Sequence, residues 1–127
     1  MRFRPVRLDM KKYFSKLFRW EKGRQNTGYD KMLVGGGFWP NPFDLYLLRF
    51  EEGQEIPPHT DKVEGGEHYR LNIVLKTAKE GGEFLCKDPI YETKRIKYFR
   101  SDVSEHAVSK VKKGTRYVFS IGWVKHT

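Results

Sequence analysis

The stretch "EHAVSKVKKGTRYVFSIGW", residues 105–123, contains two apolar runs separated by a short basic segment. The segment "KKG" is typical of a tight turn, so the runs predict neighbouring antiparallel strands at 106–111 and 116–124. Within the second run, Arg116 and Ser120 share one face, and the residues between them alternate between the two faces. Both faces are largely apolar. We therefore expect this strand to be buried on both sides and Arg116 to require a carboxylate partner.

Turn-forming residues divide the rest of the chain in the same way. Clusters of Gly or Pro occur at 35–42, 53–58, 65–66 and 81–82. They separate short runs rich in aromatic and β-branched residues, which is the pattern of a β protein. The further strands that these runs predict are 44–50, 56–61, 69–76, 83–86 and 95–99. Together these strands predict a mainly β sandwich or jelly roll, with its barrel at about 43–125.

Two groups of glycines have different interpretations. The triplet "GGG", residues 35–37, lacks the strand, spacing and lysine of a phosphate-binding loop, and we interpret it as flexible backbone. Gly81 and Gly82, in "EGGEF", are interpreted as turn and close-packing residues rather than catalytic ones.

An amphipathic pattern precedes the β region. In "DMKKYFSKLFRW", residues 9–20, apolar side chains recur at the three-and-four spacing of one helix face, and Asp9 is placed to cap the N-terminus. We therefore predict one N-terminal helix at 9–20 whose apolar face covers a sheet. Its other face is basic and also suits a phosphate backbone, which is the less favoured interpretation.

Length and composition limit the class of protein. A chain of 127 residues predicts a single domain over residues 1–127, and its content of 38% hydrophobic and 15% aromatic residues excludes a disordered chain. The net charge of +9 favours anionic partners, although solvated lysine faces are the commoner cause of such a charge. The single Cys86 excludes an internal disulfide, and no apolar run matches a signal peptide or a membrane span. We therefore expect a cytoplasmic protein without membrane contact.

A candidate metal site begins at "PPHTD", residues 57–61. On a strand, residues two apart point to the same side, so His59 and Asp61 can direct an imidazole and a carboxylate at one ion. Chance gives such a pair in roughly one chain in five, and alone it is better explained as a polar surface turn. His106 supplies a third ligand, and Arg116 follows ten residues later on the partner strand. Two histidines and a carboxylate form the facial triad of non-haem Fe(II) oxygenases, and the Arg suits a carboxylate of the cosubstrate.

With these residues in place, the chain resembles the Fe(II)- and 2-oxoglutarate-dependent dioxygenase superfamily, and within it the prolyl 4-hydroxylase-like branch. The resemblance runs from about Leu45 to Trp123. It is carried by "LLRFEEGQEIPPHTD", "YRLNIVLK", "EGGEFLC" and "EHAVSKVKKGTRYVFSIGW". It implies a double-stranded β-helix with Fe(II) held by His59, Asp61 and His106, and with the distal carboxylate of 2-oxoglutarate bound by Arg116.

The resemblance also implies further contacts to 2-oxoglutarate. Ser120 matches the position of a Thr or Ser that hydrogen-bonds the same carboxylate in relatives. Phe50 departs from the pattern, because many relatives have there a Tyr whose hydroxyl reaches the cosubstrate. Phe50 can form a wall of the pocket but cannot donate, and the loss of one such hydrogen bond costs roughly 1.5–3 kcal/mol. Tyr46, Asn72 and Lys76 are the candidates that replace it.

Three other polar residues have no assigned role. His68 and His126 show no partner spacing and are interpreted as ordinary exposed residues. Arg70 shares a strand face with Asn72, and contact with substrate and contact with nearby carboxylates both stay open for it.

The resemblance implies a reaction in which O₂ and 2-oxoglutarate yield succinate and CO₂ while a C–H bond of the substrate is hydroxylated, with ascorbate as a further candidate cofactor. Recognition would fall to the loops at 62–68 and 87–95. A protein or peptide side chain, such as prolyl, is favoured as the substrate over nucleic acid. The alternatives are oxidation or demethylation of a nucleobase, favoured by the +9 charge, and a non-catalytic basic β-barrel binding module.

Overall fold

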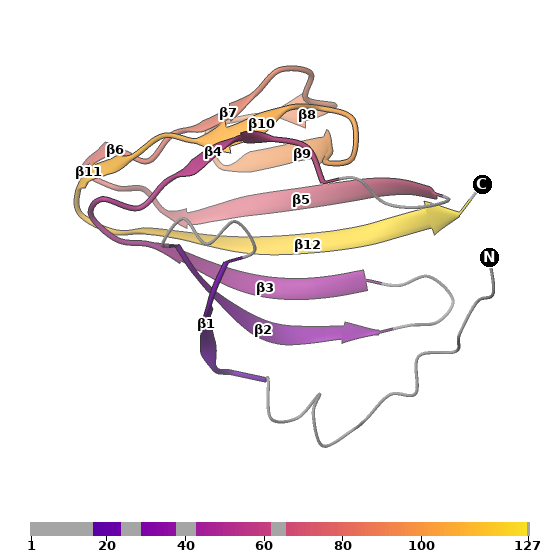
Figure 1. Ribbon diagram of the computed structural model, residues 1–127, viewed down its shortest axis with the longest axis horizontal. Helices are drawn as coiled ribbons and strands as arrows, with labels where there is room; N and C mark the ends of the chain where they lie inside the picture. Colours follow the sequence, from indigo (N-terminus) through magenta and orange to yellow (C-terminus); the bar gives the residue numbers. More distant parts are fainter. Residues whose placement is uncertain (1–16, 24–28, 38–42, 62–65, 127) are drawn as a thin grey trace.

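Figure 1 shows the computed structural model, which describes residues 17–23, 29–37, 43–61 and 66–126. In this part of the chain there are twelve strands and no helix, so the predicted mainly β fold is confirmed. The strands are β1 (Trp20–Lys22), β2 (Asp30–Gly37), β3 (Phe43–Phe50), β4 (Ile56–His59), β5 (Gly66–Lys76), β6 (Glu80–Gly81), β7 (Phe84–Cys86), β8 (Tyr91–Glu92), β9 (Ile96–Arg100), β10 (His106–Val108), β11 (Val111–Lys113) and β12 (Arg116–His126).

Two sheets enclose the interior. The larger sheet has seven strands in the order β1-β2-β3-β12-β5-β9-β8. The smaller sheet has the order β4-β10-β7 and lies over the β5 and β9 side of the larger one in Figure 1. The pair β11-β6 lies at the end where β12 begins. Side chains from both sheets therefore face a common space.

β12 is the strand that organises the inner face of the larger sheet. It pairs antiparallel with β3 on one side and with β5 on the other. Ser120 stands opposite Tyr46 of β3 and Asn72 of β5, so three polar side chains form one row. Arg116 opens the strand opposite Phe50. The alternation predicted from the sequence is confirmed, because alternate residues in the first half of β12 are buried.

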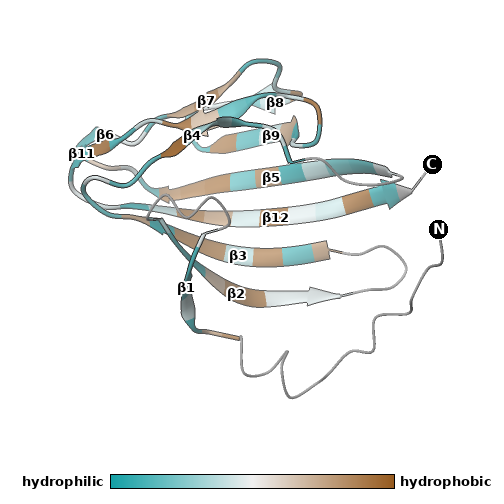
Figure 2. Ribbon diagram, in the orientation of Figure 1, coloured by the Kyte–Doolittle hydropathy of each residue, from teal (hydrophilic) through white to brown (hydrophobic). Residues whose placement is uncertain are grey.

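Apolar side chains from both sheets form the core. Its buried members are Tyr29, Phe50, Val74, Val108, Val111 and Val118. Figure 2 shows hydrophobic and hydrophilic stretches alternating along β3 and β5, as expected for strands with two different faces. Removal of these side chains from water stabilises the packing of the sheets against each other.

The interpretation of "GGG" as flexible backbone is wrong. Residues 35–37 belong to β2, and they pair with the first residues of β3. A Cβ atom at Gly36 would lie 2.9 Å from the carbonyl oxygen of Phe43, and one at Gly37 would overlap the Phe43 ring. The glycines therefore allow two strands and an aromatic ring to approach closely, which is a packing role rather than a conformational one.

The predicted helix at 9–20 lies mostly outside the described residues. Its last four residues are described and are not helical. Leu17 forms a bridge to Leu33, Phe18 has a φ of 59°, and Trp20 opens β1. For this end of the segment the helix prediction is wrong, because pairing with β2 replaces helical hydrogen bonds. In the part of the chain that the structure describes, no helix is long and apolar enough to cross a membrane.

The other strand predictions agree with the structure within a few residues, with two differences. The run at 106–111 is divided into β10 and β11, which belong to different sheets, and its predicted antiparallel pairing with 116–124 is wrong. β10 pairs with β4 and β7, whereas β12 pairs with β3 and β5, because the chain crosses from the smaller sheet to the larger one between them. Four strands were not predicted: β1, β2, β6 and β8. Three of them are very short and carry few alternating residues, so periodicity detects them poorly, and β2 contains the glycine triplet.

Candidate metal centre and its cavity

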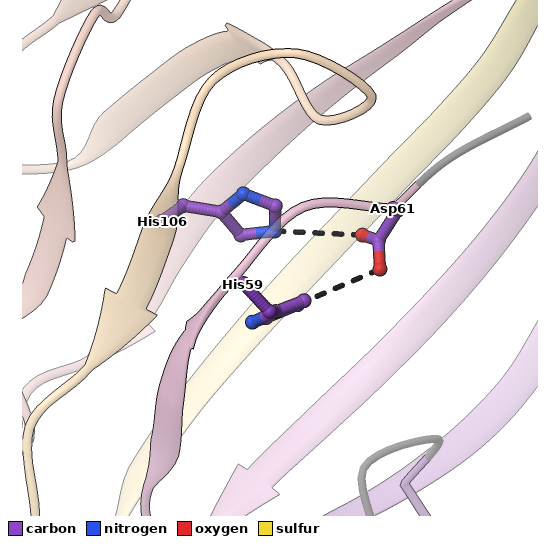
Figure 3. A group of neighbouring side chains, drawn as sticks. All are labelled: His59, Asp61 and His106. Atoms are coloured by element: carbon purple, nitrogen blue, oxygen red, sulfur yellow. Dashed lines mark ion pairs between the residues drawn. The ribbon is translucent and has the colours of Figure 1, made fainter.

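The two predicted histidines lie side by side on neighbouring strands. His59 ends β4 and His106 opens β10, and they are cross-strand partners with ring centroids 4.3 Å apart. Asp61 follows β4 and points at both rings (Figure 3). His106 Nε2 lies 3.4 Å from Asp61 Oδ2, and His59 Nε2 lies 3.5 Å from Asp61 Oδ1. The candidate ligand atoms of the three residues all lie within 4.8 Å of one another.

Backbone carbonyls fix the orientation of both imidazoles. His59 Nδ1 donates to the carbonyl oxygen of Pro57 at 2.8 Å, and His106 Nδ1 donates to that of Ser104 at 2.9 Å. A carbonyl oxygen can only accept, so each ring carries a proton on Nδ1, and Nε2 is the atom that faces Asp61. A metal-ligating histidine is usually oriented in this way, by a hydrogen bond from its non-ligating ring nitrogen to a carbonyl or carboxylate oxygen.

The donor set fits a ferrous ion. Two imidazoles and one carboxylate on one side of a cavity match the facial triad that leaves coordination positions open. The backbone of Asp61 is held as well, since its N–H donates to the carbonyl oxygen of Ser101 at 2.7 Å. His59, Asp61 and His106 are therefore the residues that could hold the metal.

A cavity of about 280 Å³ lies beside the triad. Of the residues predicted to contact metal or cosubstrate, all except Lys76 line it: His59, Asp61, His106, Arg116, Ser120, Phe50, Tyr46 and Asn72. Lining residues that the sequence did not indicate include Tyr29, Lys31, Asp44 and His68. The structure thus brings the predicted residues together, while their roles toward cosubstrate stay predictions.

Arg116 is a buried cation without a carboxylate partner among the described residues. Its exposed fraction is 4%, and its guanidinium carbon lies 5.4 Å from the centroid of the Phe50 ring. Burial lowers the pKa of Arg116 to about 10, and no charged neighbour offsets this effect. A buried, unpaired guanidinium is costly unless an anion binds it. The cavity therefore offers a binding position for a carboxylate.

The polar row in the middle of the cavity is already hydrogen-bonded. Arg70 Nη1 donates to Ser120 Oγ at 2.6 Å, and Ser120 Oγ donates to Asn72 Oδ1 at 2.6 Å. Arg70 Nη2 donates to Asp44 Oδ1 at 2.8 Å. Of the two roles left open for Arg70, contact with a nearby carboxylate is the one observed. The one hydroxyl proton of Ser120 is used by Asn72 in this arrangement.

Gly122 provides the space for the Arg70 guanidinium. The side chain of Arg70 crosses from β5 over β12 to Asp44 on β3. A Cβ atom at residue 122 would collide with the guanidinium and would lie 3.1 Å from Asp44 Oδ1. Only glycine therefore permits this ion pair across three strands.

We expect Gly122→Ala to lower the free energy of unfolding by about 1–3 kcal/mol, because the new methyl group displaces the Arg70 side chain from its hydrogen bonds. Urea unfolding measures this. Gly35→Ala is the matched control, since its Cβ would meet only the flexible Leu45 side chain at 3.1 Å. Equal losses in the two variants would contradict the assigned role of Gly122.

Two predictions about single residues are wrong. Lys76 is exposed and does not line the cavity. Tyr117 pairs with Lys76 while Val118 pairs with Val74, so Leu75 is an extra residue in a bulge that reverses the alternation. His68 is not an ordinary exposed residue: it lines the cavity beside a hydrogen-bonded Ser.

The surroundings of His68 determine its charge. Its Nδ1 lies 2.8 Å from Ser101 Oγ, and Ser101 is fully buried. Burial lowers the pKa of His68, and the positive charge of Arg70 adds to this effect. His68 is therefore neutral at physiological pH. For His126 the structure gives only its place as the last residue of β12.

Gly81 and Gly82 behave as predicted. Both have positive φ values, 75° and 67°. A Cβ at Gly81 would collide with the backbone of Lys110, and one at Gly82 would lie 2.8 Å from Val111. They are turn and close-packing residues.

Fold and donor set together define a jelly-roll protein with three side chains that could hold a metal ion. The family model of the 2OG-Fe(II) oxygenase superfamily matches residues 45–125, and the chain belongs to this superfamily. Membership implies Fe(II) and 2-oxoglutarate as cofactor and cosubstrate. The match ends near the limits of the predicted barrel and does not distinguish a prolyl 4-hydroxylase-like branch.

Similar solved structures support the fold alone. The cupin domain of Schizosaccharomyces pombe Cnp3 superposes with a TM-score of 0.59 at 9% identity, covering 84% of this chain and 69% of that one. KdgF from Halomonas sp. superposes with a TM-score of 0.57 at 14% identity, covering 85% of this chain and 87% of that one. The chain has no match among curated protein sequences.

Proposed function

We propose that this protein is an Fe(II)- and 2-oxoglutarate-dependent dioxygenase that hydroxylates a C–H bond of its substrate. The observation that carries the proposal is that one cavity holds both the His59, Asp61 and His106 donor set and the guanidinium of Arg116, which has no carboxylate partner among the described residues. A metal site alone would suit many jelly-roll proteins. A buried cation in the same cavity adds the requirement for an anionic ligand, which 2-oxoglutarate meets with its distal carboxylate.

Each residue has a defined task in this proposal. His59, Asp61 and His106 hold Fe(II), which when bound supplies the redox chemistry that converts O₂ and 2-oxoglutarate into succinate and CO₂ with hydroxylation of the substrate. The carbonyl oxygens of Pro57 and Ser104 keep the two imidazoles in the ligating tautomer. The protein supplies positioning, and the cofactor supplies the oxidation.

The rest of the cavity binds and shields the cosubstrate. Arg116 binds the distal carboxylate of 2-oxoglutarate at the end of the cavity next to Phe50. The apolar side chains of Phe50 and Val108 belong to one buried cluster that lines the cavity, and they exclude water from that carboxylate. In a site from which water is excluded, a charge pair is stronger than in solution.

For the substrate we propose a protein or peptide side chain, with a prolyl residue as the first candidate. The resemblance of the runs around His59 and His106 to the prolyl 4-hydroxylase-like branch supports this choice. The exposed segment 87–95, which includes β8, is available for recognition. Oxidation of a nucleobase and a non-catalytic binding role are the alternatives, and a substrate screen distinguishes them.

Purified protein with Fe(II), ascorbate and 2-oxoglutarate is screened against peptides and single-stranded oligonucleotides. Succinate is measured, and mass spectrometry detects the gain of one oxygen atom or the loss of a methyl group. We expect a proline-containing peptide to gain oxygen and to stimulate succinate formation. A modified oligonucleotide would favour the nucleobase alternative. Equal background turnover by the wild-type protein and His106→Ala would favour the non-catalytic one.

A further inference from the structure

The carboxylate position at Arg116 needs a second donor. A carboxylate has two oxygens with about four lone-pair sites, and one guanidinium does not satisfy all of them. Apart from its histidines, the described lining of the cavity contains four neutral side chains that can donate: Tyr29, Tyr46, Asn72 and Ser120. His59 and His106 belong to the metal site, and His68 stands opposite Val124, at the other end of β12 from Arg116. One of these four side chains completes the carboxylate site. This inference rests on the proposed function, because it presumes that 2-oxoglutarate occupies the cavity.

Ser120 and Asn72 are already hydrogen-bonded to each other. Arg70 carries only donors, so Ser120 Oγ must accept from it and is left to donate its proton to Asn72 Oδ1. This chain of hydrogen bonds is held at its far end by Asp44, away from Arg116. Tyr46 stands opposite Ser120, so it lies at the same level of the sheet as these bonds.

Tyr29 lies at the level of Arg116. Its ring stacks on Phe50 with centroids 5.2 Å apart and an interplanar angle of 15°. Phe50 is the cross-strand partner of Arg116, and its ring contacts the guanidinium. Tyr29 and Arg116 therefore pack on the same ring, and both line the cavity. Only 8% of Tyr29 is exposed, so the residue belongs to the interior rather than to the surface.

Gly23 packs against Tyr29 and fixes the position of its ring. The backbone N–H of Gly23 donates to the carbonyl oxygen of Tyr29 at 2.9 Å. A Cβ at Gly23 would overlap the hydroxyl-bearing end of the Tyr29 ring, so glycine is needed there. Burial raises the pKa of Tyr46, and its neighbours Asp44 and Tyr29 add to the rise, which is consistent with two phenols that face one cavity.

We propose that the hydroxyl of Tyr29 donates a hydrogen bond to the distal carboxylate of 2-oxoglutarate bound by Arg116. Tyr29 thereby supplies the donor that Phe50 lacks. Its hydroxyl comes from the segment before β2 rather than from the end of β3. Ser120 and Asn72 line the cavity but keep their hydrogen bond to each other, so neither donates to this carboxylate.

Calorimetric titration of the full chain, loaded with Mn(II), tests this assignment with two ligands. Mn(II) takes the same nitrogen and oxygen ligands as Fe(II) and keeps chemistry out of the measurement. The ligands are 2-oxoglutarate and 2-oxobutanoate, a 2-oxo acid that has no distal carboxylate. We expect Tyr29→Phe to weaken 2-oxoglutarate binding roughly 10- to 100-fold, the effect of one hydrogen bond to a charged group, and to leave 2-oxobutanoate binding unchanged.

Two further variants separate the hydroxyl from a structural effect. Tyr117→Phe removes a hydroxyl next to Arg116 in sequence but outside the cavity, and it should bind both ligands like the wild type. In Tyr29→Phe combined with Phe50→Tyr, a hydroxyl returns on the neighbouring ring, and we expect part of the 2-oxoglutarate affinity to return. Thermal unfolding of each metal-free variant confirms that it is folded.

The possible results separate the two proposals. If the wild-type protein does not prefer 2-oxoglutarate over 2-oxobutanoate, the cosubstrate site itself fails, and the proposed function fails with it. If the wild type has this preference and Tyr29→Phe keeps it in full, only the role of Tyr29 is overturned. Equal weakening of both ligands by Tyr29→Phe would also overturn it, because that pattern indicates a general disturbance of the cavity.

Discussion

Replacement of His106 by alanine is expected to lower the affinity for Fe(II) or Mn(II) by more than about 100-fold, because outer-sphere changes alone cost 10- to 100-fold and this change removes a ligand. The remaining His59 and Asp61 form an ordinary pair that binds divalent metals weakly. Succinate formation should fall to background for the same reason. Metal affinity is measured by calorimetric titration, and turnover by succinate release.

The loss of His106 also removes packing, so a control for folding is needed. Only 7% of His106 is exposed, and its ring centroid lies 4.7 Å from that of Phe99. The melting temperature of the metal-free variant shows whether the fold survives. His68→Asn is the matched control, because His68 lies in the same cavity and Asn can keep the hydrogen bond to Ser101. A folded His106→Ala protein with wild-type metal affinity would contradict the assignment of the metal site.

Arg116→Met is expected to change ligand binding and stability in opposite directions. Binding of 2-oxoglutarate should weaken roughly 100-fold or more, because the carboxylate loses a buried charge partner. The ligand-free protein should become more stable by about 1–3 kcal/mol, because a buried, unpaired cation is replaced by an apolar chain of similar length. Calorimetry measures the affinity, and urea unfolding without ligand measures the stability.

The pKa of Arg116 sets the sign and the pH range of the stability change. Its pKa in the folded protein is lowered to about 10 by burial, which corresponds to at most about 3 kcal/mol against the charged form. The guanidinium is charged in both states below pH 10, so the destabilisation is fully present at neutral pH. It declines as the pH rises through 10, where the folded state loses the proton first.

The gain in the free energy of unfolding that Arg116→Met brings should therefore be constant from neutral pH to about 9 and decrease above that. Arg95→Met, at an exposed position, is the matched control and should change neither 2-oxoglutarate affinity nor its pH dependence. With saturating 2-oxoglutarate and Mn(II), the wild-type protein should become more stable than Arg116→Met, since the ligand stabilises only the protein that binds it. A less stable ligand-free Arg116→Met protein would mean that another group already pairs with this guanidinium.

Only part of the metal site was predictable from short spacings. His59 and Asp61 are two residues apart at the end of a strand, and local backbone geometry places such a pair on one side. His106 and Arg116 were expected on neighbouring strands, but β10 belongs to the smaller sheet and β12 to the larger one. Their approach to one cavity therefore depends on the packing of the two sheets, and the resemblance to the superfamily, not local geometry, predicted it.

Other interpretations failed where distant strands alter a local pattern. Lys76 was expected to face inward by alternation, and a one-residue bulge against β12 turned it outward. The triplet at 35–37 looked like a loop, and its pairing with β3 makes it a strand. A period of two predicts a face only as long as the register of the partner strand stays constant.

The sequence by itself determined the mainly β class, the three candidate ligands and the arginine, because alternation is a property of the local chain and the family motifs mark the residues of its distant segments. Tertiary structure alone decided which polar groups surround that arginine. Arg70 reaches Asp44 across 26 positions of the chain and Ser120 across 50, and Tyr29 reaches Phe50 from before β2. These contacts depend on the order and register of β3, β12 and β5, which no single segment encodes.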